Sequence, residues 1–178
     1  MSAPGHKERI SVLLSQPLCL KCLQYLPNFV CRSEASHVPL PDSCTAATFP
    51  LFDHLVGAIR DNEFYIAGMS NGGLSAFHVA ASYPQYFLSV TGFPGYLPDP
   101  TPQRVAALSK MCINMHVGEL DSGWRQDMQE QASLFRSKGM TVKITVEKGE
   151  NHVIRALTGE GATRLFDEIE AAPKGCGK

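Results

Sequence analysis

The stretch that decides the fold is residues 64–73, which read Phe-Tyr-Ile-Ala-Gly-Met-Ser-Asn-Gly-Gly. The first five of these residues form a compact apolar run, which is typical of a β-strand covered on both faces. A segment rich in small residues follows, and we expect it to form a helix that ends just before Pro84. At the junction, Gly68, Ser70 and Gly72 form a G-x-S-x-G pattern, which is typical of a sharp strand-to-helix turn that exposes a nucleophilic serine.

The G-x-S-x-G pattern predicts a tight turn with a specific chemistry. Larger side chains at the two glycines would collide, and the serine hydroxyl is left exposed in a strained conformation. The next backbone N–H, that of Asn71, is expected to face the same space and to stabilise an oxyanion there, helped by the positive end of the following helix. The pattern also occurs by chance in glycine-rich turns, but the strand before it and the helix after it favour a nucleophile at Ser70.

The rest of the chain alternates between strand-like and helix-like segments. Residues 124–138 have helical periodicity and Gly139 is placed to end that helix, whereas residues 141–147 alternate between apolar and polar, which indicates a strand near a sheet edge. The alternation predicts an α/β fold with a mainly parallel sheet of about six strands and helices on both faces. The predicted strands are residues 10–14, 28–32, 64–68, 87–93, 111–117 and 141–147.

Two further candidate residues follow predicted strands, at the edge where parallel sheets place their chemistry. Asp121 follows the strand at 111–117 and is the candidate acid, while Glu119, two residues closer to the strand, is the competing acid. The alternative interpretation is that Asp121 or Ser122 merely caps the helix that comes next. His152 follows the last predicted strand and is the candidate base, with a solvated loop histidine as the alternative.

Four stretches, taken in order, resemble those of one known family. They are FYIAGMSNGG at 64–73, a proline-rich segment at 94–102, HVGELDSGW at 116–124 and EKGENH at 147–152. They resemble the α/β-hydrolase superfamily, in particular its small carboxylesterase and dienelactone-hydrolase-like branch. The resemblance extends from about residue 63 to the end, and it implies that Ser70 is the nucleophile, Asp121 the acid and His152 the base of a serine hydrolase. The implied substrate is a small-molecule ester or thioester, and no cofactor or metal is implied.

Residues 1–62 fit this resemblance less well than the catalytic part at residues 63–172. In the family, a His-Gly-rich loop follows the first central strand, here residues 10–14, and completes the oxyanion hole. This chain has Ser-Gln-Pro-Leu at 15–18 instead, with no His-Gly pair. We also expect residues 10–14 to pair with the outer edge of strand 64–68, because an unpaired apolar edge would promote aggregation.

The identity of the second oxyanion donor is therefore open. Pro17 has no N–H to donate, so Gln16 is the candidate donor beside Asn71. Loss of one oxyanion donor typically lowers the rate by about 10²–10³. The sequence therefore predicts weak activity, and it leaves a second interpretation: a catalytically impaired hydrolase-like protein that acts as a binding or interaction module.

The composition fits one globular domain at residues 1–178, with a mass of 19.4 kDa. Lys plus Arg number 16 and Asp plus Glu number 17, so the chain lacks the basic surface typical of a nucleic-acid-binding protein. No apolar run approaches the roughly 20 residues that a membrane span needs. Six cysteines are too few for a disulfide scaffold, which predicts mostly reduced thiols and a cytoplasmic location. The oligomeric state stays open.

Other features have plainer interpretations. Cys19 and Cys22 form a C-x-x-C, but no second pair or structural zinc spacing accompanies them, so no metal is expected. The sequence contains no phosphate-binding glycine motif, so it does not suggest a nucleotide cofactor. Trp124 is expected in the core rather than against a substrate, and Tyr96 either lines an acyl pocket or packs its own loop.

Overall fold

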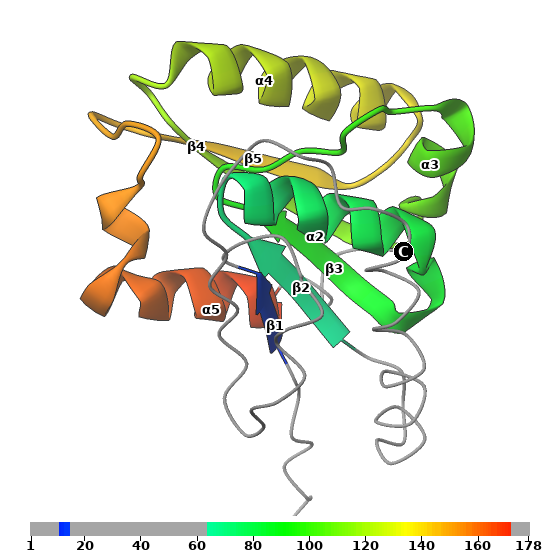
Figure 1. Ribbon diagram of the computed structural model, residues 1–178, viewed down its shortest axis with the longest axis horizontal. Helices are drawn as coiled ribbons and strands as arrows, with labels where there is room; N and C mark the ends of the chain where they lie inside the picture. The colour runs from blue at the N-terminus through cyan, green and yellow to red at the C-terminus, as the bar shows by residue number, and fades with distance from the viewer. Residues whose placement is uncertain (1–10, 15–63, 172–178) are drawn as a thin grey trace, which may run out of the picture.

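The apolar runs assemble into one parallel sheet (Figure 1). The computed structural model describes residues 11–14 and 64–171. Within these residues the sheet has five strands that are neighbours in chain order: β1 (Ser11–Leu14), β2 (Phe64–Gly68), β3 (Phe87–Gly92), β4 (Cys112–Gly118) and β5 (Val142–Glu147). The predicted α/β class and parallel sheet are confirmed. The predicted strand at 28–32 lies outside the described residues, so the count of six strands is not confirmed.

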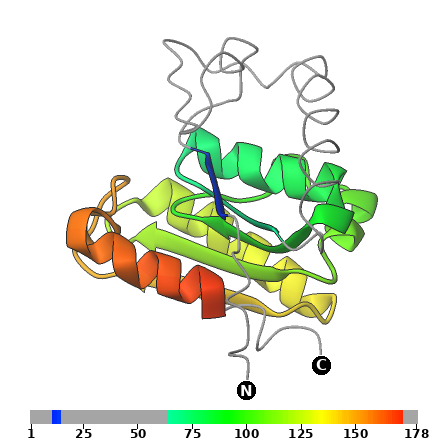
Figure 2. The same ribbon diagram turned by 90° about the horizontal axis from the view of Figure 1, so that it is seen from below.

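Helices cover both faces of this sheet, as the sequence predicts. The α-helices of the described residues are α2 (Asn71–Ser82), α3 (Pro102–Ala107), α4 (Ser122–Ser137) and α5 (Ala162–Ala171). Short 3₁₀ turns are η2 (Pro84–Tyr86), η3 (Arg155–Leu157) and η4 (Gly159–Gly161). Figure 2 shows α2 and α5 on opposite sides of the strands. All the strands run the same way, so the loops that follow them emerge at one edge of the sheet.

Helix α4 forms where the sequence has its clearest helical stripe. Met128, Ala132 and Phe135 are spaced by four and three residues, which puts them on one helix face, and all three are buried. Gly139 follows the helix with a φ of 76°, a conformation that costs glycine little. The helix begins two residues earlier than the apolar stripe, at Ser122, so Asp121 is the residue that immediately precedes it.

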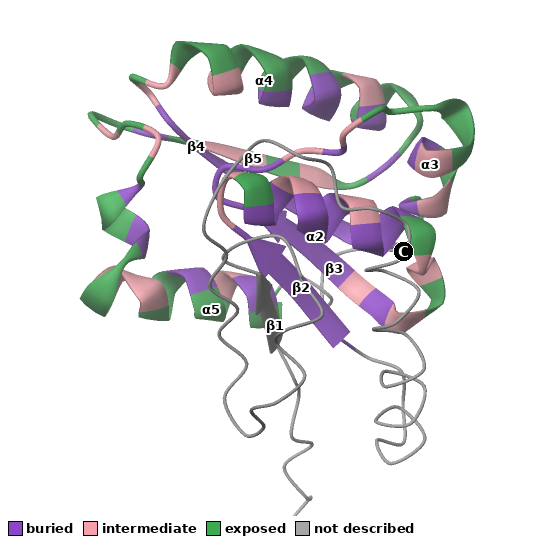
Figure 3. Ribbon diagram, viewed as in Figure 1, coloured by how far each residue is buried: buried purple, intermediate pink, exposed green. Residues whose placement is uncertain are grey.

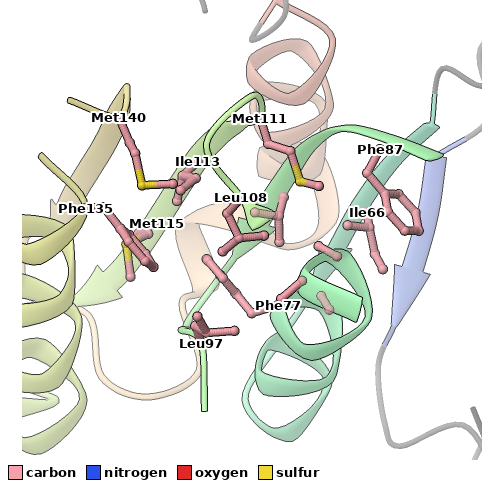
Figure 4. Close-up of a cluster of buried hydrophobic side chains, with 14 of the residues drawn as sticks. Ile66, Phe77, Phe87, Leu97, Leu108, Met111, Ile113, Met115, Phe135 and Met140 are labelled. Carbon is pink, nitrogen blue, oxygen red and sulfur yellow. The ribbon is translucent and has the colours of Figure 1, made fainter. Parts of the chain in front are cut away.

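The two faces of the sheet pack against separate apolar clusters. Phe64 and Ile66 of β2 join a larger cluster with α2 and α4, whereas Tyr65 and Ala67 join a smaller one with α5. All of β2 is buried, which explains its uniformly apolar sequence (Figure 3). Figure 4 shows Phe77 of α2 inside the larger cluster. Full burial of such a side chain stabilises the fold by about 1.5–3 kcal/mol.

An ionic cluster around the buried His116 joins α5 to the sheet. His116 of β4 is fully buried, and its Nδ1 lies 3.0 Å from Oε1 of Glu147, which also accepts a hydrogen bond from Arg164 at 2.7 Å. Glu168 of α5 accepts a hydrogen bond from Lys143 at 2.6 Å. Burial raises the pKa of Glu168, but the hydrogen bond from Lys143 and the charges of its basic neighbours outweigh burial, so this pKa lies below its usual value. The cluster fastens α5 to β4 and β5.

Cys112 is an exception to the expectation of mostly reduced thiols. It is the first residue of β4, it is buried, and it is disulfide-bonded. The other cysteines lie outside the described residues, so the expectation is not tested for them. The cytoplasmic location, which depended on reduced thiols, stays a prediction from the sequence.

The strands at the two edges of the described sheet follow the predictions in part. In β5, which lies at an edge, Val142 and Ile144 are half-buried and Lys143 is exposed. The expected alternation fails in the second half of the strand, where Val146 is exposed and Glu147 is buried. At the other edge, β1 pairs in parallel with β2, from Ser11 opposite Tyr65 to Leu14 opposite Gly68. The predicted pairing of residues 10–14 with strand 64–68 is therefore confirmed for residues 11–14.

Deletion of residues 1–14 is expected to make the protein insoluble. It removes β1 and leaves the backbone donors and acceptors along the edge of β2 free to pair with other molecules. The soluble fraction after centrifugation measures this effect, and deletion of residues 1–9, which keeps β1, is the matched control. A soluble and folded 15–178 fragment would show that β1 is dispensable.

Candidate active site

The turn between β2 and α2 has the geometry that the G-x-S-x-G pattern predicts. Ser70 has a φ of 55° and a ψ of −123°, and a positive φ is uncommon for a residue other than glycine. A Cβ atom at Gly68 would lie only 2.1 Å from the backbone oxygen of Gly72, so the chain approaches itself too closely for any larger residue there. Strained backbone of this kind persists where the surrounding structure enforces it, commonly at functional sites.

The loop after β3 holds this turn in place. The N–H of Ser70 donates to the carbonyl of Pro94 at 2.8 Å, and the N–H of Phe93 donates to the carbonyl of Gly68 at 2.9 Å. A Cβ atom at Gly73 would lie 2.3 Å from the same Pro94 oxygen, which explains the second glycine at the start of α2. The proline-rich loop is thus part of the elbow. Its role in holding the turn could not be predicted from the sequence, because every residue has a backbone carbonyl that can accept such a hydrogen bond.

Asp121 directs its carboxylate at His152 instead of capping the helix that follows. It occupies the position before α4, yet its side chain makes no hydrogen bond to the helix. Its Oδ2 lies 2.7 Å from Nδ1 of His152. The Asp121 side chain is 14% exposed and the His152 side chain 36%, so a shielded carboxylate holds an imidazole that faces solvent. The helix-cap interpretation of Asp121 is therefore wrong.

Glu119, the competing acid, has a different partner. Its Oε2 accepts a hydrogen bond from the N–H of Gly149 at 2.9 Å, and its own N–H donates to the carbonyl of Glu147 at 2.9 Å. These bonds tie the loop after β4 to the end of β5 and to the loop that follows it. Of these two acids, Asp121 is the one that contacts His152.

The loop that carries His152 is fixed by bonds on both sides. The N–H of Leu120 donates to the carbonyl of Glu150 at 2.9 Å, which joins this loop to the one that carries Asp121. The carboxylate of Glu150 accepts from two backbone N–H groups of η3 at 2.9 and 3.1 Å. These bonds bring Nε2 of His152 to 2.8 Å from Oγ of Ser70. Glu150 was missed as a positioning group because its partners are backbone atoms.

The three side chains that the sequence singles out thus form one hydrogen-bonded row. An ionised carboxylate can only accept, so the bond to Asp121 puts the hydrogen of a neutral His152 on Nδ1. Nε2 is then left with a lone pair that accepts from the hydroxyl of Ser70. This tautomer can take a proton from the serine.

The predicted oxyanion donor Asn71 is available at the start of α2. It is exposed, and its N–H has no acceptor among the described residues, as is usual for the first N–H groups of a helix. An incoming oxygen beside Ser70 can use this donor. Gln16 lies outside the described residues, so the second donor stays a prediction.

Two aromatic rings lie beside this row. Trp124 was expected in the core, but it is half-buried: it packs against the larger core cluster, and its ring centroid lies 5.1 Å from that of His152. Tyr96 packs edge-to-face on Trp124, with ring centroids 5.2 Å apart. The sequence indicated only a core role for Trp124, because its contact with His152 depends on how α4 meets the loop after β5.

Gly118 allows the acid loop and the histidine loop to touch. A Cβ atom there would lie 2.2 Å from the carbonyl oxygen of Asn151. We expect Gly118→Ala to push the loops apart, lowering the melting temperature by about 3 °C or more. Turnover that depends on Ser70 should fall by about 10²-fold, because the row loses its alignment. Gly123→Ala is the matched control, since a Cβ there meets no atom within 4 Å. Equal stability and turnover of the two variants would contradict the close approach.

The reactive groups at this edge of the sheet are a hydroxyl, an imidazole and a carboxylate. In the part of the chain that the structure describes, no group of three or more His, Cys, Asp or Glu residues could hold a metal ion. None of the helices described here is long and apolar enough to cross a membrane.

The comparison with known sequences gives one partial relative. No protein-family model matches the chain. Over 85 residues the chain is 36% identical to "Putative esterase NocK" of Nocardia uniformis subsp. tsuyamanensis. The match covers 47% of this chain and 24% of that protein, so the chain spans about a quarter of the length of this curated relative.

Solved structures are similar to this chain over most of its length. A thermostable esterase is similar with a TM-score of 0.54 and 17% identity, over 71% of this chain and 37% of that chain. Acyl-protein thioesterase 2 of Zea mays is similar with a TM-score of 0.59 and 14% identity, over 97% of each chain. The chain has the α/β-hydrolase fold, as the sequence motifs predict.

Proposed function

We propose that this chain is a serine hydrolase that cleaves a small carboxylic ester or thioester through an acyl-enzyme on Ser70. The observation that carries the proposal is the row of hydrogen bonds from Ser70 Oγ to His152 at 2.8 Å and from His152 to Asp121 at 2.7 Å. The names of proteins with the same fold, an esterase and an acyl-protein thioesterase, support the ester and thioester class.

In the proposed acylation step, Oγ of Ser70 attacks the acyl carbon while Nε2 of His152 accepts the serine proton. Asp121 keeps the imidazole in the required tautomer and stabilises the cation that forms. The negative charge that develops on the carbonyl oxygen is stabilised by the N–H of Asn71 and by the N-terminal end of α2. When the tetrahedral intermediate collapses, the bond to the alcohol or thiol breaks and His152 returns the proton to the leaving group.

Deacylation repeats the same chemistry with water as the nucleophile. His152 accepts a proton from water as its oxygen attacks the acyl carbon. Collapse then releases the carboxylic acid, and the proton returns to Oγ of Ser70. The 36% exposure of the His152 side chain supports this step, because water can reach the imidazole. The reaction needs no group beyond the side chains and backbone donors named here.

We expect the activity to be weak. The N–H of Asn71 at the start of α2 is the proposed first oxyanion donor, whereas the 15–18 segment lacks the His-Gly loop that usually supplies the second. A hydrolase with one such donor is slower by about 10²–10³ than one with two. The rate therefore depends on how well the N–H of Gln16, the proposed second donor, replaces the missing loop.

Hydrolysis of 4-nitrophenyl acetate and of the matching aryl thioacetate tests the proposed function. We expect release of nitrophenolate and thiolate above the buffer rate, with saturation in substrate and dependence on Ser70. The variant Gln16→Pro, which removes that backbone donor, should slow both reactions. Absence of any turnover by the well-folded chain would favour the binding-module interpretation instead.

A further inference from the structure

Trp124 lies where it can control the orientation of His152. Its ring packs edge-to-face on the imidazole, with centroids 5.1 Å apart and an interplanar angle of 64°. Tyr96 packs on Trp124 in the same way, at 5.2 Å and 63°. Edge-to-face pairs at these distances are attractive, and they restrict both rings. The aromatic contact thus adds a third restraint to the two hydrogen bonds of the imidazole.

The structure holds Trp124 firmly enough to serve this purpose. Its helix α4 is anchored in the core, and Gln131 of this helix is buried and forms two hydrogen bonds with the backbone of Leu97, at 2.7 and 2.8 Å. Tyr96 is joined to α4 through a hydrogen bond with Asp127. Burial raises the pKa of the Tyr96 hydroxyl, and the charge and hydrogen bond of Asp127 raise it further. The loop after β3 and the helix α4 therefore form one support behind the indole ring.

The restraint matters because the hydrogen bonds of His152 do not fix the ring by themselves. A ring held at Nδ1 and Nε2 can still rock about the line that joins its two partners. During the proposed reaction the bond to Oγ of Ser70 is also lost, since that oxygen becomes part of the acyl-enzyme. Nε2 must then aim first at the leaving group and afterwards at water, while only Asp121 and the packing contact hold the ring.

We propose that Trp124 is a positioning residue that keeps His152 aligned while its hydrogen bond to Ser70 is exchanged. This inference rests on the proposed serine hydrolase function. It assigns the indole no contact with the substrate. A loss of Trp124 should therefore slow the steps that His152 catalyses without weakening substrate binding.

Kinetics of Trp124→Leu, measured with 4-nitrophenyl acetate, tests the positioning role. We expect kcat to fall about tenfold, the size of one aromatic contact, with KM changed by less than about twofold. Trp124→Phe keeps an aromatic ring and should recover most of the kcat. Phe135→Leu, on the same helix but 11 residues and about 16 Å further along it, is the control for lost packing, and it should keep the kcat of the folded protein.

The fluorescence of Trp124 provides a second readout that needs no activity. Trp124 is the one tryptophan of the chain, so the emission reports its surroundings alone. We expect His152→Ala to change the emission intensity, because the imidazole contact is lost, while Ser133→Ala on the solvent side of α4 leaves it unchanged. An unchanged kcat in Trp124→Leu, a rise in KM alone, or unaltered emission in His152→Ala would each overturn the inference. An active wild type with any of these results leaves the proposed function standing, whereas turnover that is absent or independent of Ser70 overturns both.

Discussion

Ser70→Ala is expected to lower ester turnover by roughly 10⁴-fold or more, while the protein stays folded. The substitution removes the oxygen atom that attacks the acyl carbon, and it leaves the imidazole of His152 without its partner at 2.8 Å. What remains is the effect of the oxyanion donor and of substrate binding. The measurement is the rate of 4-nitrophenyl acetate hydrolysis with each purified variant, together with its melting temperature.

The matched control for this loss is Ser82→Ala. Ser82 lies at the other end of α2, where its hydroxyl bonds to the carbonyl of His78 at 2.9 Å, so this variant removes a hydroxyl from the same helix outside the site. It should keep turnover near that of the wild type. Turnover by Ser70→Ala equal to that of Ser82→Ala would show that the nucleophile lies elsewhere.

Asp121→Asn is expected to lower kcat by about 10⁴-fold with little effect on the fold. An asparagine amide can donate to Nδ1, which favours the tautomer with hydrogen on Nε2 and removes the lone pair that Ser70 needs. Glu119→Gln is the matched control, because it changes an acid two residues away whose carboxylate accepts from the N–H of Gly149.

The two variants should differ in kind. Glu119→Gln keeps an acceptor oxygen for the N–H of Gly149, so it should lower the melting temperature slightly and turnover by less than about tenfold. Asp121→Asn should leave the melting temperature nearly unchanged and lower turnover by about 10⁴-fold. If Glu119→Gln abolishes turnover and Asp121→Asn is silent, the assignment of the acid is wrong.

The site residues could be named from the sequence because a parallel sheet converts chain order into position. Ser70, Asp121 and His152 each follow a strand, and all these strands end at the same edge of the sheet. The apolar runs placed the strands, and the glycines around Ser70 reported the tight turn. That reasoning needed no knowledge of side-chain contacts, which is why it predicted the juxtaposition and yet left Asp121 and Glu119 as alternatives.

The contacts that hold the site together could not be read in the same way. Three of these contacts involve backbone atoms, which every residue offers. They are the hydrogen bond to the Pro94 carbonyl, the bonds of the Glu150 carboxylate to the N–H groups of η3, and the close approach at Gly118. The contact of Trp124 with His152 joins residues 28 positions apart through the packing of α4, which depends on how the elements meet. Periodicity reports which face of a helix is buried, and it does not report which residue lies against that face.

The central claim, that Ser70 is an activated nucleophile, is tested most directly by covalent labelling. The folded chain is incubated with a fluorophosphonate, its intact mass is measured, and the modified peptide is sequenced by mass spectrometry. Our account predicts one adduct per chain, located on Ser70, with none in Ser70→Ala and much slower labelling in His152→Ala, because Oγ then has no base at 2.8 Å. An unlabelled wild-type chain, or an adduct that forms on another residue and persists in Ser70→Ala, would contradict it.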